Sequence, residues 1–209
     1  MQGIKNVIFD LGGVIINLDL NRTISAFNAL SDKKFQKIYT QASQTELFNL
    51  LDTGRISEKD FFAEIRKEIN FFGKDDVLLQ AWNAMLLDVP EKRLDVLVEM
   101  KHNYNTFLLS NTCEPHITAF EKDLYIDHGI KNFDDYFDKV YYSCRVGLRK
   151  PNKEIFEMVL AENNLKPEET VFIDDSAQHV QGAGNCGINS FLLERNKEIG
   201  QLLKELKLI

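Results

Sequence analysis

The stretch VIFDLGGVI, residues 7–15, decides the fold of this chain. Three apolar residues lead directly into Asp10, and a glycine pair, Gly12 and Gly13, follows. A short continuous apolar run is typical of a strand buried in a parallel sheet. Ligands of open α/β sheets bind outside the carboxyl ends of the strands. Asp10 is therefore expected where such a sheet carries out chemistry, although an ordinary turn also explains these residues taken alone.

Length and charge narrow the class of protein. The chain has 209 residues, which suits one large domain or a core domain with a smaller second one. A hydrophobic content of 44% and a charged content of 27% are typical of a soluble globular protein. The formal net charge of -7 disfavours nucleic acid and anionic membranes as partners. An anionic substrate remains compatible if a metal ion and one or two cations reverse the local field.

The cysteines and the first apolar run indicate the compartment. Cys113, Cys144 and Cys186 form an odd, sparse set without CxxC spacing, which predicts neither a disulfide framework nor a zinc site. Asp10 interrupts the first apolar run, and no cleavage site follows, so we expect no signal peptide. Apolar runs of transmembrane length are not found either. The expected location is the cytoplasm, and the oligomeric state stays open.

Strands and helices alternate through most of the chain. Further buried strands are predicted at 106–109, 138–143, 170–173 and 189–193, with helical patterns between them. This alternation is typical of βαβ units and predicts an α/β fold with a doubly wound parallel sheet. A loop is predicted over 144–150 (CRVGLRK), followed by a helix that Asn152 caps.

Residues 17–88 have a different pattern, because nothing in them reads as a buried strand. Helical spacing is predicted over 20–30, 46–51, 57–69 and 75–87, and Ser31 is a candidate N-cap for a further helix that holds Phe35 and Ile38. We therefore predict an all-helical domain over 17–88, inserted into an α/β core of residues 1–16 and 89–209.

Polar side chains follow three of the predicted strands, and a lysine opens a helix nearby. These residues are Asp10, Ser110, Asn111, Lys150, Asp174 and Asp175. Taken singly, each is also explained by a turn, a solvated lysine or a helix cap. In a doubly wound sheet with neighbouring strands they converge at one edge. Their common position therefore predicts a functional site.

The chemistry of this set points to phosphoryl transfer. Three carboxylates raise one another's pKa, and a hard divalent cation such as Mg²⁺ relieves their repulsion. With the metal in place, Asp10 can act as a nucleophile and form an acyl phosphate. Lys150 adds positive charge, while the Ser110 hydroxyl and backbone amides near Leu11 and Gly12 hydrogen-bond the phosphate oxygens. Glycine allows that close backbone approach.

These segments together resemble the haloacid dehalogenase-like superfamily. The four characteristic motifs appear as FDLGGVI, LLSNT, GLRKPNKEIF and VFIDDSAQHVQGA, in the expected order and covering nearly the whole chain. The helical insert resembles the C1-type cap of that superfamily. The first motif, combined with LSNT and GxRKP, is most similar to the branch typified by bacterial α-D-glucose-1-phosphate phosphatase, which is related to the phosphatase domain of soluble epoxide hydrolase.

The resemblance implies a role for each acidic residue. Asp10 would be the nucleophile and a magnesium ligand, and the Gly12 carbonyl would bind the same ion. Asp175 would bind the metal directly, with Asp174 as a second ligand or one that acts through water. A magnesium ion is therefore the implied cofactor.

The phosphate and the cap have implied contacts as well. Ser110 and Asn111 would bind the phosphate, and Lys150 would neutralise it and steady Asp10. The cap would close over the substrate, with Gly54 and Arg55 in a loop that reaches the site.

Two positions depart from the pattern of the superfamily. Most of its phosphatases carry a general acid–base aspartate two residues after the nucleophile, where this chain has Gly12. A positioned acid–base contributes roughly 10²–10⁴ in rate. His179 stands where many relatives have asparagine, and it is either a substitute acid or, as we favour, a packed or surface histidine. Without an acid, a sugar 1-phosphate is the expected substrate, because an anomeric oxygen leaves readily.

The predicted function is a magnesium-dependent phosphatase acting on a small phosphorylated metabolite through an aspartyl-phosphate intermediate. The alternative is a non-catalytic phosphate-binding or regulatory protein that has lost the acid at Gly12. A mutase role is disfavoured because it needs that acid, and dehalogenation is disfavoured because it needs no metal. The residues that set specificity stay open, with Asp19, Asn21, Arg55, Glu114, His116 and the cap aromatics as candidates.

Overall fold

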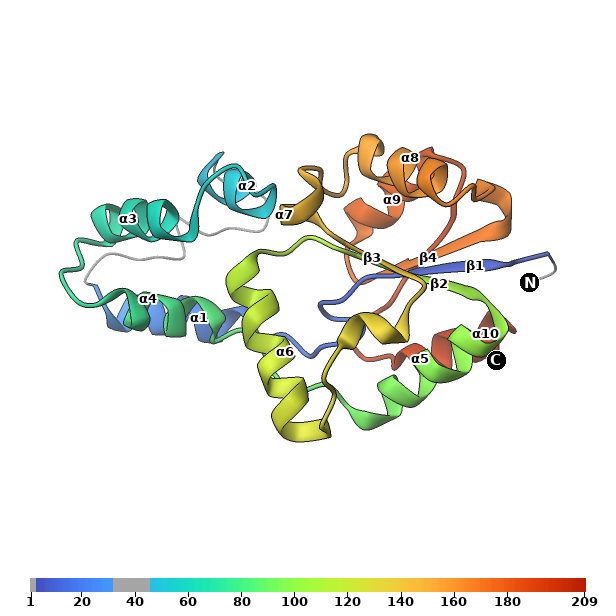
Figure 1. The fold of residues 1–209 in the computed structure, drawn as a ribbon, viewed down its shortest axis with the longest axis horizontal. Helices are drawn as coiled ribbons and strands as arrows, with labels where there is room; N and C mark the ends of the chain where they lie inside the picture. The colour runs from blue at the N-terminus through green and yellow to red at the C-terminus, as the bar shows by residue number, and fades with distance from the viewer. Residues whose placement is uncertain (1–2, 32–45) are drawn as a thin grey trace.

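Five parallel strands form a single sheet in a computed structural model that describes residues 3–31 and 46–209 (Figure 1). The strands lie in the order β3-β2-β1-β4-β5, so the first strand is central. Their bounds are β1 Asn6–Phe9, β2 Asn105–Ser110, β3 Lys139–Tyr142, β4 Thr170–Asp174 and β5 Asn189–Leu192. The predicted α/β class and all five predicted strands are confirmed.

The register of the three central strands positions the polar residues. Phe9 lies opposite Leu108 of β2 and Ile173 of β4, and the Asp10 N–H donates to the Ile173 carbonyl over 2.9 Å. The residues that follow these partners therefore emerge at the same edge of the sheet. The order of the strands, in which β2 and β4 flank β1, produces the convergence expected from the sequence.

Helices cover both faces of the sheet. Figure 1 shows α8 (Lys153–Glu162) and α9 (Ala177–Asn185) on one face, and α5 (Glu91–Asn103) and α10 (Ile199–Glu205) on the other. Strand side chains alternate between the two faces, so Ile8 packs with the cluster under α8 and α9 while Val7 and Phe9 pack with the opposite cluster. Helix α6 (Glu114–His128) joins the second cluster through Ile117 and Phe120.

Among the described residues, four helices form a separate layer beyond the carboxyl ends of the strands (Figure 1). These cap helices are α1 (Leu20–Ala29), α2 (Glu46–Asp52), α3 (Glu58–Ile69) and α4 (Asp75–Asn83). They bury a cluster of their own around Phe27, Phe61 and Trp82. The inserted helical cap is confirmed as far as its described residues go, while its exact boundaries at residues 16 and 89 stay a prediction.

The two segments that join the cap to the core pair with each other. Leu18 and Leu86 form an antiparallel bridge, and the Asp19 N–H donates to the Met85 carbonyl over 2.9 Å. The Asn17 and Asp88 side chains are also hydrogen-bonded at 3.0 Å. The helix α4 ends at Asn83, short of the predicted 87, because Ala84 and Met85 form a turn that leads into the bridge at Leu86.

Other element boundaries differ from the sequence prediction for local reasons. The predicted loop after β3 begins with a short helix, α7 (Ser143–Val146), which Gly147 ends with a positive φ of 73°. Pro90 is the N-cap of α5. Short 3-10 turns, η2 (Phe133–Tyr136) and η3 (Pro167–Glu169), complete the core. The helix predicted around Phe35 and Ile38 lies outside the described residues.

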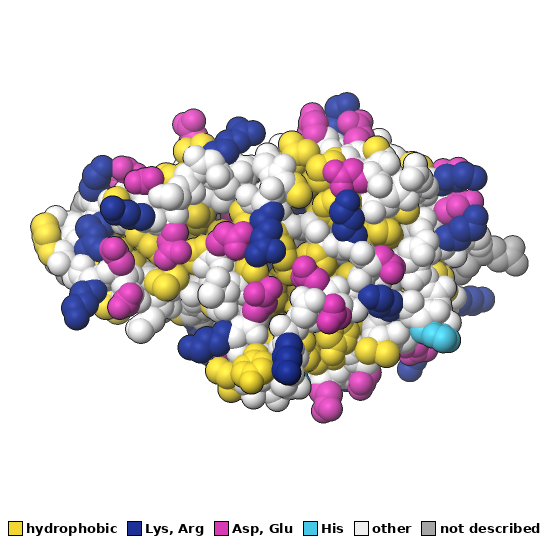
Figure 2. Space-filling model, viewed as in Figure 1, with side chains coloured by type: hydrophobic (Ala, Val, Ile, Leu, Met, Phe, Trp, Pro, Cys, Tyr) yellow, Lys and Arg dark blue, Asp and Glu magenta, His cyan; other side chains and the backbone are white. Residues whose placement is uncertain are grey.

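The surface is charged with both signs. On the face shown in Figure 2, acidic and basic side chains are interleaved over the cap helices and the core alike. A basic stripe typical of nucleic-acid-binding proteins is not seen on that face. The absence of nucleic acid partners stays a prediction. None of the helices in the described part of the chain has the length and apolar character needed to cross a bilayer.

Candidate active site

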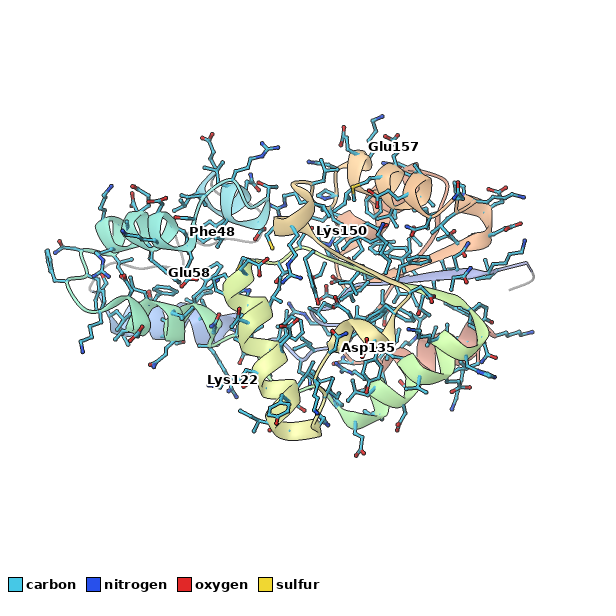
Figure 3. The ribbon with its side chains drawn as sticks, in the orientation of Figure 1. Phe48, Glu58, Lys122, Asp135, Lys150 and Glu157 are labelled. Atoms are coloured by element: carbon cyan, nitrogen blue, oxygen red, sulfur yellow. The ribbon has the colours of Figure 1, made fainter. Side chains whose placement is uncertain are left out.

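Lys150, which Figure 3 labels in the core, contacts several residues of the polar edge. Its side chain is 0% exposed, and its ammonium donates over 2.7 Å to Asp10 Oδ1 and over 2.7 Å to Asp174 Oδ2. The third donor reaches the Leu109 carbonyl at 2.8 Å. All three N–H donors of the ammonium are thereby used. The structure thus brings together Asp10, Lys150 and Asp174, three of the residues that the sequence predicted at this site.

Asn111 fixes the loop that carries this lysine. Its side-chain carbonyl accepts from the Lys150 N–H at 2.9 Å, and its amide donates to the Lys150 carbonyl at 2.8 Å. Both ends of the Asn111 side chain are thus bonded to one residue. The sequence assigned Asn111 to phosphate binding, whereas its side chain here positions Lys150. A phosphate contact from the Asn111 main chain stays a prediction.

Burial and mutual repulsion separate the two aspartates beside Lys150. Burial and the charge of Asp174 raise the pKa of Asp10 to about 7, although Lys150 opposes this. Burial acts in the same direction on Asp174, but Lys150 and His179 outweigh it and hold the Asp174 pKa at about 2. The two carboxylates also outweigh burial at Lys150 and keep its pKa above the ordinary value. Asp174 and Lys150 are therefore a charged pair, and Asp10 is the group whose charge depends on a further cation.

Further contacts hold Asp174 in place. Its Oδ1 accepts from the Ser176 N–H at 2.8 Å and lies 3.0 Å from His179 Nδ1. His179 comes from the first turn of α9 and is mostly buried. The sequence left its role open between substitute acid and packed histidine, and its bond to Asp174 fits the second.

Three carboxylates at this edge have the chemistry of a magnesium site. Oxygen atoms of Asp10, Asp174 and Asp175 all lie within 4.8 Å of one another. Asp175 is the most exposed residue of the three, but partial burial of its carboxyl group, together with the charge of Asp174, still raises its pKa. A Cβ on Gly13, whose φ is 73°, would lie 2.2 Å from Asp175 Oδ2, so only glycine leaves that carboxylate in place. Hard oxygen donors of this kind fit Mg²⁺, and Asp175 is the least occupied of them.

A cavity of about 580 Å³ separates this edge from the cap. The core contributes the predicted residues Asp10, Leu11, Gly12, Ser110, Asn111, Lys150 and Asp175 to its lining. The cap contributes Phe48, Asp52, Trp82, Met85 and Leu86. Figure 3 shows Phe48 among the cap helices and Lys150 in the core. The volume is in the range of small-molecule sites, and the candidate nucleophile is in its floor.

The space beside Gly12 is apolar. A Cβ placed on Gly12 would lie 2.5 Å from Leu18 Cδ1, and Leu18 lines the same cavity. An acidic side chain at this position would have to displace Leu18. The lack of the usual acid is therefore matched by a leucine that fills its place.

Trp82 and His116 form a flat wall of the cavity. Their rings are stacked with centroids 5.1 Å apart and an interplanar angle of 9°. The indole N–H donates to Cys113 Sγ at 3.3 Å, which ties α4 to the core. Burial lowers the pKa of His116 to about 4, so its ring is neutral. Of the candidates for substrate contact, His116 lines the cavity, whereas Glu114 forms an ion pair with Arg145.

Sequence reasoning missed Arg149 and Asp52. Arg149 Nη2 lies 3.3 Å from Asp52 Oδ2, and its Nη1 donates to Asn49 Oδ1, so one side chain bridges the core and α2. The signal in the sequence was the place of Arg149 in the GxRKP motif, beside Lys150. Burial raises the pKa of Asp52 to about 6, with the guanidinium opposing the shift.

Other cap candidates lie elsewhere. Gly54 packs so tightly on the core that a Cβ would lie 2.1 Å from the Cys144 carbonyl oxygen. Arg55 lines an adjoining cavity of about 560 Å³, which shares Arg149 and Lys150 with the first. Asp19 caps α1 by accepting from the Asn21 N–H.

Comparisons with known proteins agree with this architecture. The family model described as haloacid dehalogenase-like hydrolase matches residues 7–193. A D-ribitol-5-phosphate phosphatase of Bacteroides thetaiotaomicron is 30% identical over 208 residues, which cover 96% of this chain and 97% of that protein.

Solved structures give the same result. A haloacid dehalogenase family enzyme of Bacteroides thetaiotaomicron, an aspartate-to-alanine mutant in complex with magnesium and inorganic phosphate, superposes with a TM-score of 0.90. It is 31% identical, with 96% of this chain and 99% of that chain covered. A predicted hydrolase of this type from Porphyromonas gingivalis has a TM-score of 0.88 at 30% identity, covering 98% of each chain. Since the family model and these relatives extend over nearly the whole sequence, the chain belongs to the haloacid dehalogenase-like hydrolases.

Proposed function

We propose that this protein is a magnesium-dependent phosphatase that hydrolyses a phosphorylated sugar or polyol through an aspartyl-phosphate intermediate. The observation that carries the proposal is the buried Lys150 between Asp10 and Asp174, in the floor of a cavity that the cap covers. A relative of similar length is a D-ribitol-5-phosphate phosphatase, and a structural relative binds magnesium and phosphate.

The proposed metal ligands are Asp10, Asp175 and the Gly12 carbonyl, with Asp174 acting through water because Lys150, Ser176 and His179 already occupy its oxygens. Bound Mg²⁺ supplies positive charge that draws the substrate phosphate to the carboxylates and keeps Asp10 ionised. Burial and the charge of Asp174 raise the pKa of Asp10 to about 7, so without this added positive charge Asp10 is only partly ionised near neutral pH.

The residues of the chain then perform the transfer. The free oxygen of Asp10 attacks phosphorus, and the bond from phosphorus to the substrate oxygen breaks. Lys150 and the Ser110 hydroxyl stabilise the negative charge on the equatorial oxygens, with backbone N–H groups at Leu11 and Gly12. The leaving oxygen takes its proton from water, since Leu18 occupies the place of an acid. Water then cleaves the acyl phosphate and regenerates the carboxylate.

The absence of an acid also bears on the substrate. An anomeric oxygen leaves with less need for protonation than a primary alkoxide, which favours sugar 1-phosphates and agrees with the resemblance to the α-D-glucose-1-phosphate phosphatase branch and its C1-type cap. The ribitol-5-phosphate relative favours a primary ester instead. Comparing kcat/KM for 1-phosphates and 6-phosphates of the same sugars decides between them. A clear preference for 6-phosphates would contradict the leaving-group argument.

Phosphate release with Mg²⁺ tests the activity itself. We expect wild-type protein to release phosphate from a panel of sugar and polyol phosphates, and chelator to abolish the release. Asp10→Asn should lower kcat by at least about 10⁴-fold, because it removes the nucleophile. Phosphate release by this variant at the wild-type rate would exclude the aspartyl-phosphate mechanism.

The apolar space beside Gly12 favours one alternative, a phosphate-binding protein without catalysis. Phosphate binding without hydrolysis of any member of the panel would support it. The cytoplasmic location also remains a prediction, and the three free cysteines fit a reducing compartment.

A further inference from the structure

We propose that Asp52 and Arg149 form a hydroxyl-binding pair in the roof of the cavity, which selects phosphate esters of polyhydroxylated molecules over plain alkyl phosphates. The inference rests on the proposed phosphatase function and names the part of the site that recognises the rest of the substrate.

The pair lies where the far end of a substrate would reach. Asp10 and Lys150 mark the phosphate end of the cavity, and Asp52 and Arg149 line the same space from α2 and from the loop before Lys150. Arg149 is adjacent to Lys150 in sequence, so the phosphate site and the roof are linked by one stretch of backbone. A molecule bound by its phosphate therefore extends toward this pair.

The pair also retains hydrogen-bonding capacity. Both side chains are largely buried, at 9% exposure for Arg149 and 17% for Asp52. Within residues 3–31 and 46–209, Arg149 Nε is a buried donor without a partner. Leaving a buried donor unpaired is costly, which is a reason to expect a ligand oxygen or water at this position.

The chemistry of the two groups matches a polyol. A carboxylate accepts hydrogen bonds and a guanidinium donates them, whereas adjacent hydroxyl groups offer both at short spacing. The Asp52 carboxylate is therefore an acceptor in this roof and the Arg149 guanidinium a donor. The nearby thiols of Cys113 and Cys144 stay protonated because burial raises their pKa to about 12. Trp82 and His116 add flat ring faces suited to the C–H surface of a sugar chain.

A purely structural role for the pair predicts a different outcome. If Arg149 only holds α2 against the core, then weakening its ion pair with Asp52 should impair all substrates equally. If the pair binds hydroxyl groups, only hydroxylated substrates should suffer. The ratio of two kcat/KM values separates these roles.

The experiment compares ribitol 5-phosphate with n-pentyl phosphate, which has the same chain length and no hydroxyl groups. With Mg²⁺, Asp52→Asn should lower kcat/KM for the polyol ester between about 10-fold and 100-fold, the loss of a charge-assisted hydrogen bond. Its kcat/KM for pentyl phosphate should stay within about threefold of wild type. Arg149→Lys, which keeps the charge and loses the fork, should change the ratio in the same direction.

Asp75→Asn is the matched control. Asp75 is also a cap aspartate paired with an arginine, Arg66, but this pair is outside both cavities. The Asp75→Asn variant should leave both kcat/KM values unchanged.

Equal losses on both substrates, or no loss, in the Asp52 and Arg149 variants would overturn the inference while leaving the phosphatase function intact. Failure of wild type to release phosphate from any member of the sugar and polyol phosphate panel would overturn the phosphatase function and this inference with it. If thermal unfolding shows that Asp52→Asn does not fold, the test rests on Arg149→Lys. The ratio of its kcat/KM values for the two esters then decides between the structural and the hydroxyl-binding role.

Discussion

The floor of the cavity, which the core forms, and its roof on the cap side differ in the chemistry of their side chains. In the floor, Lys150 is 0% exposed and its three donors are all bonded, two of them to carboxylates that the sheet register brings together. The cap side of the cavity is mostly apolar, with Asp52 as its one charged residue among those of the described chain. Charges fixed by strands suit a reaction common to many substrates, whereas a roof of adaptable side chains suits selection between them.

The largest expected effect comes from removing the buried charge of Lys150 in the floor. Lys150→Met leaves Asp10 and Asp174 uncompensated, and removing one partner of a buried ion pair costs about 3–5 kcal/mol in unfolding free energy. Phosphatase activity should be lost as well. Urea unfolding measures the first effect, and phosphate release measures the second.

Lys139→Met is the control, because Lys139 pairs with Glu162 at the surface. Surface pairs contribute little to stability. Equal destabilisation by the two variants would show that the buried lysine has no special place in the floor.

Disrupting the hydrophobic cluster of the cap should show that the cap and the core unfold separately. Phe61 is fully buried in the cap cluster, and Phe→Ala in such a site costs about 3–5 kcal/mol. We expect Phe61→Ala to accelerate amide hydrogen exchange in α1, α3 and α4 and to leave β1, β2 and β4 protected. Phe156→Ala, in the core cluster, is the matched variant and should expose both regions. Loss of protection in β1 by Phe61→Ala would mean that cap and core unfold as one unit.

A smaller effect is expected from the titration of Asp52 in the roof, which makes the free energy of unfolding depend on pH. Burial raises the pKa of Asp52 from 3.8 to about 6, so between these values the folded protein holds a proton that the unfolded chain has released. This contribution to stability is present at low pH and is lost as pH rises through 6, with a limiting slope of about 1.4 kcal/mol per pH unit. Asp52→Asn should remove that slope. Unfolding free energies of both proteins between pH 4 and 7 measure it, and parallel curves would contradict the shift.

Much of the floor was predictable from local patterns. An apolar run that ends in Asp10, another that ends in Asp174 and a third before Ser110 each identify a buried strand with a polar end. Parallel pairing then brings such ends together. The four motifs and the helical insert also follow from the order of residues along the chain.

The roof and the orientation of individual side chains were not predictable in this way. The sequence predicted that Asn111 binds phosphate and that Arg55 lies in a loop reaching the site, and both stay predictions. It gave no sign that the Asn111 side chain holds Lys150 or that Arg55 lines the adjoining cavity. The pairing of Arg149 with Asp52 could not be predicted from hydrophobic periodicity, because it depends on how α2 docks on the core.

The sequence by itself thus determined the α/β class, the helical insert and the set of polar residues at the sheet edge, since hydrophobic periodicity and strand-end chemistry are local properties. Only the tertiary structure decided that Leu18 fills the space beside Gly12, that Asp52 meets Arg149 and that Trp82 stacks on His116. These contacts join segments far apart in the chain, and their geometry depends on how the cap packs against the core.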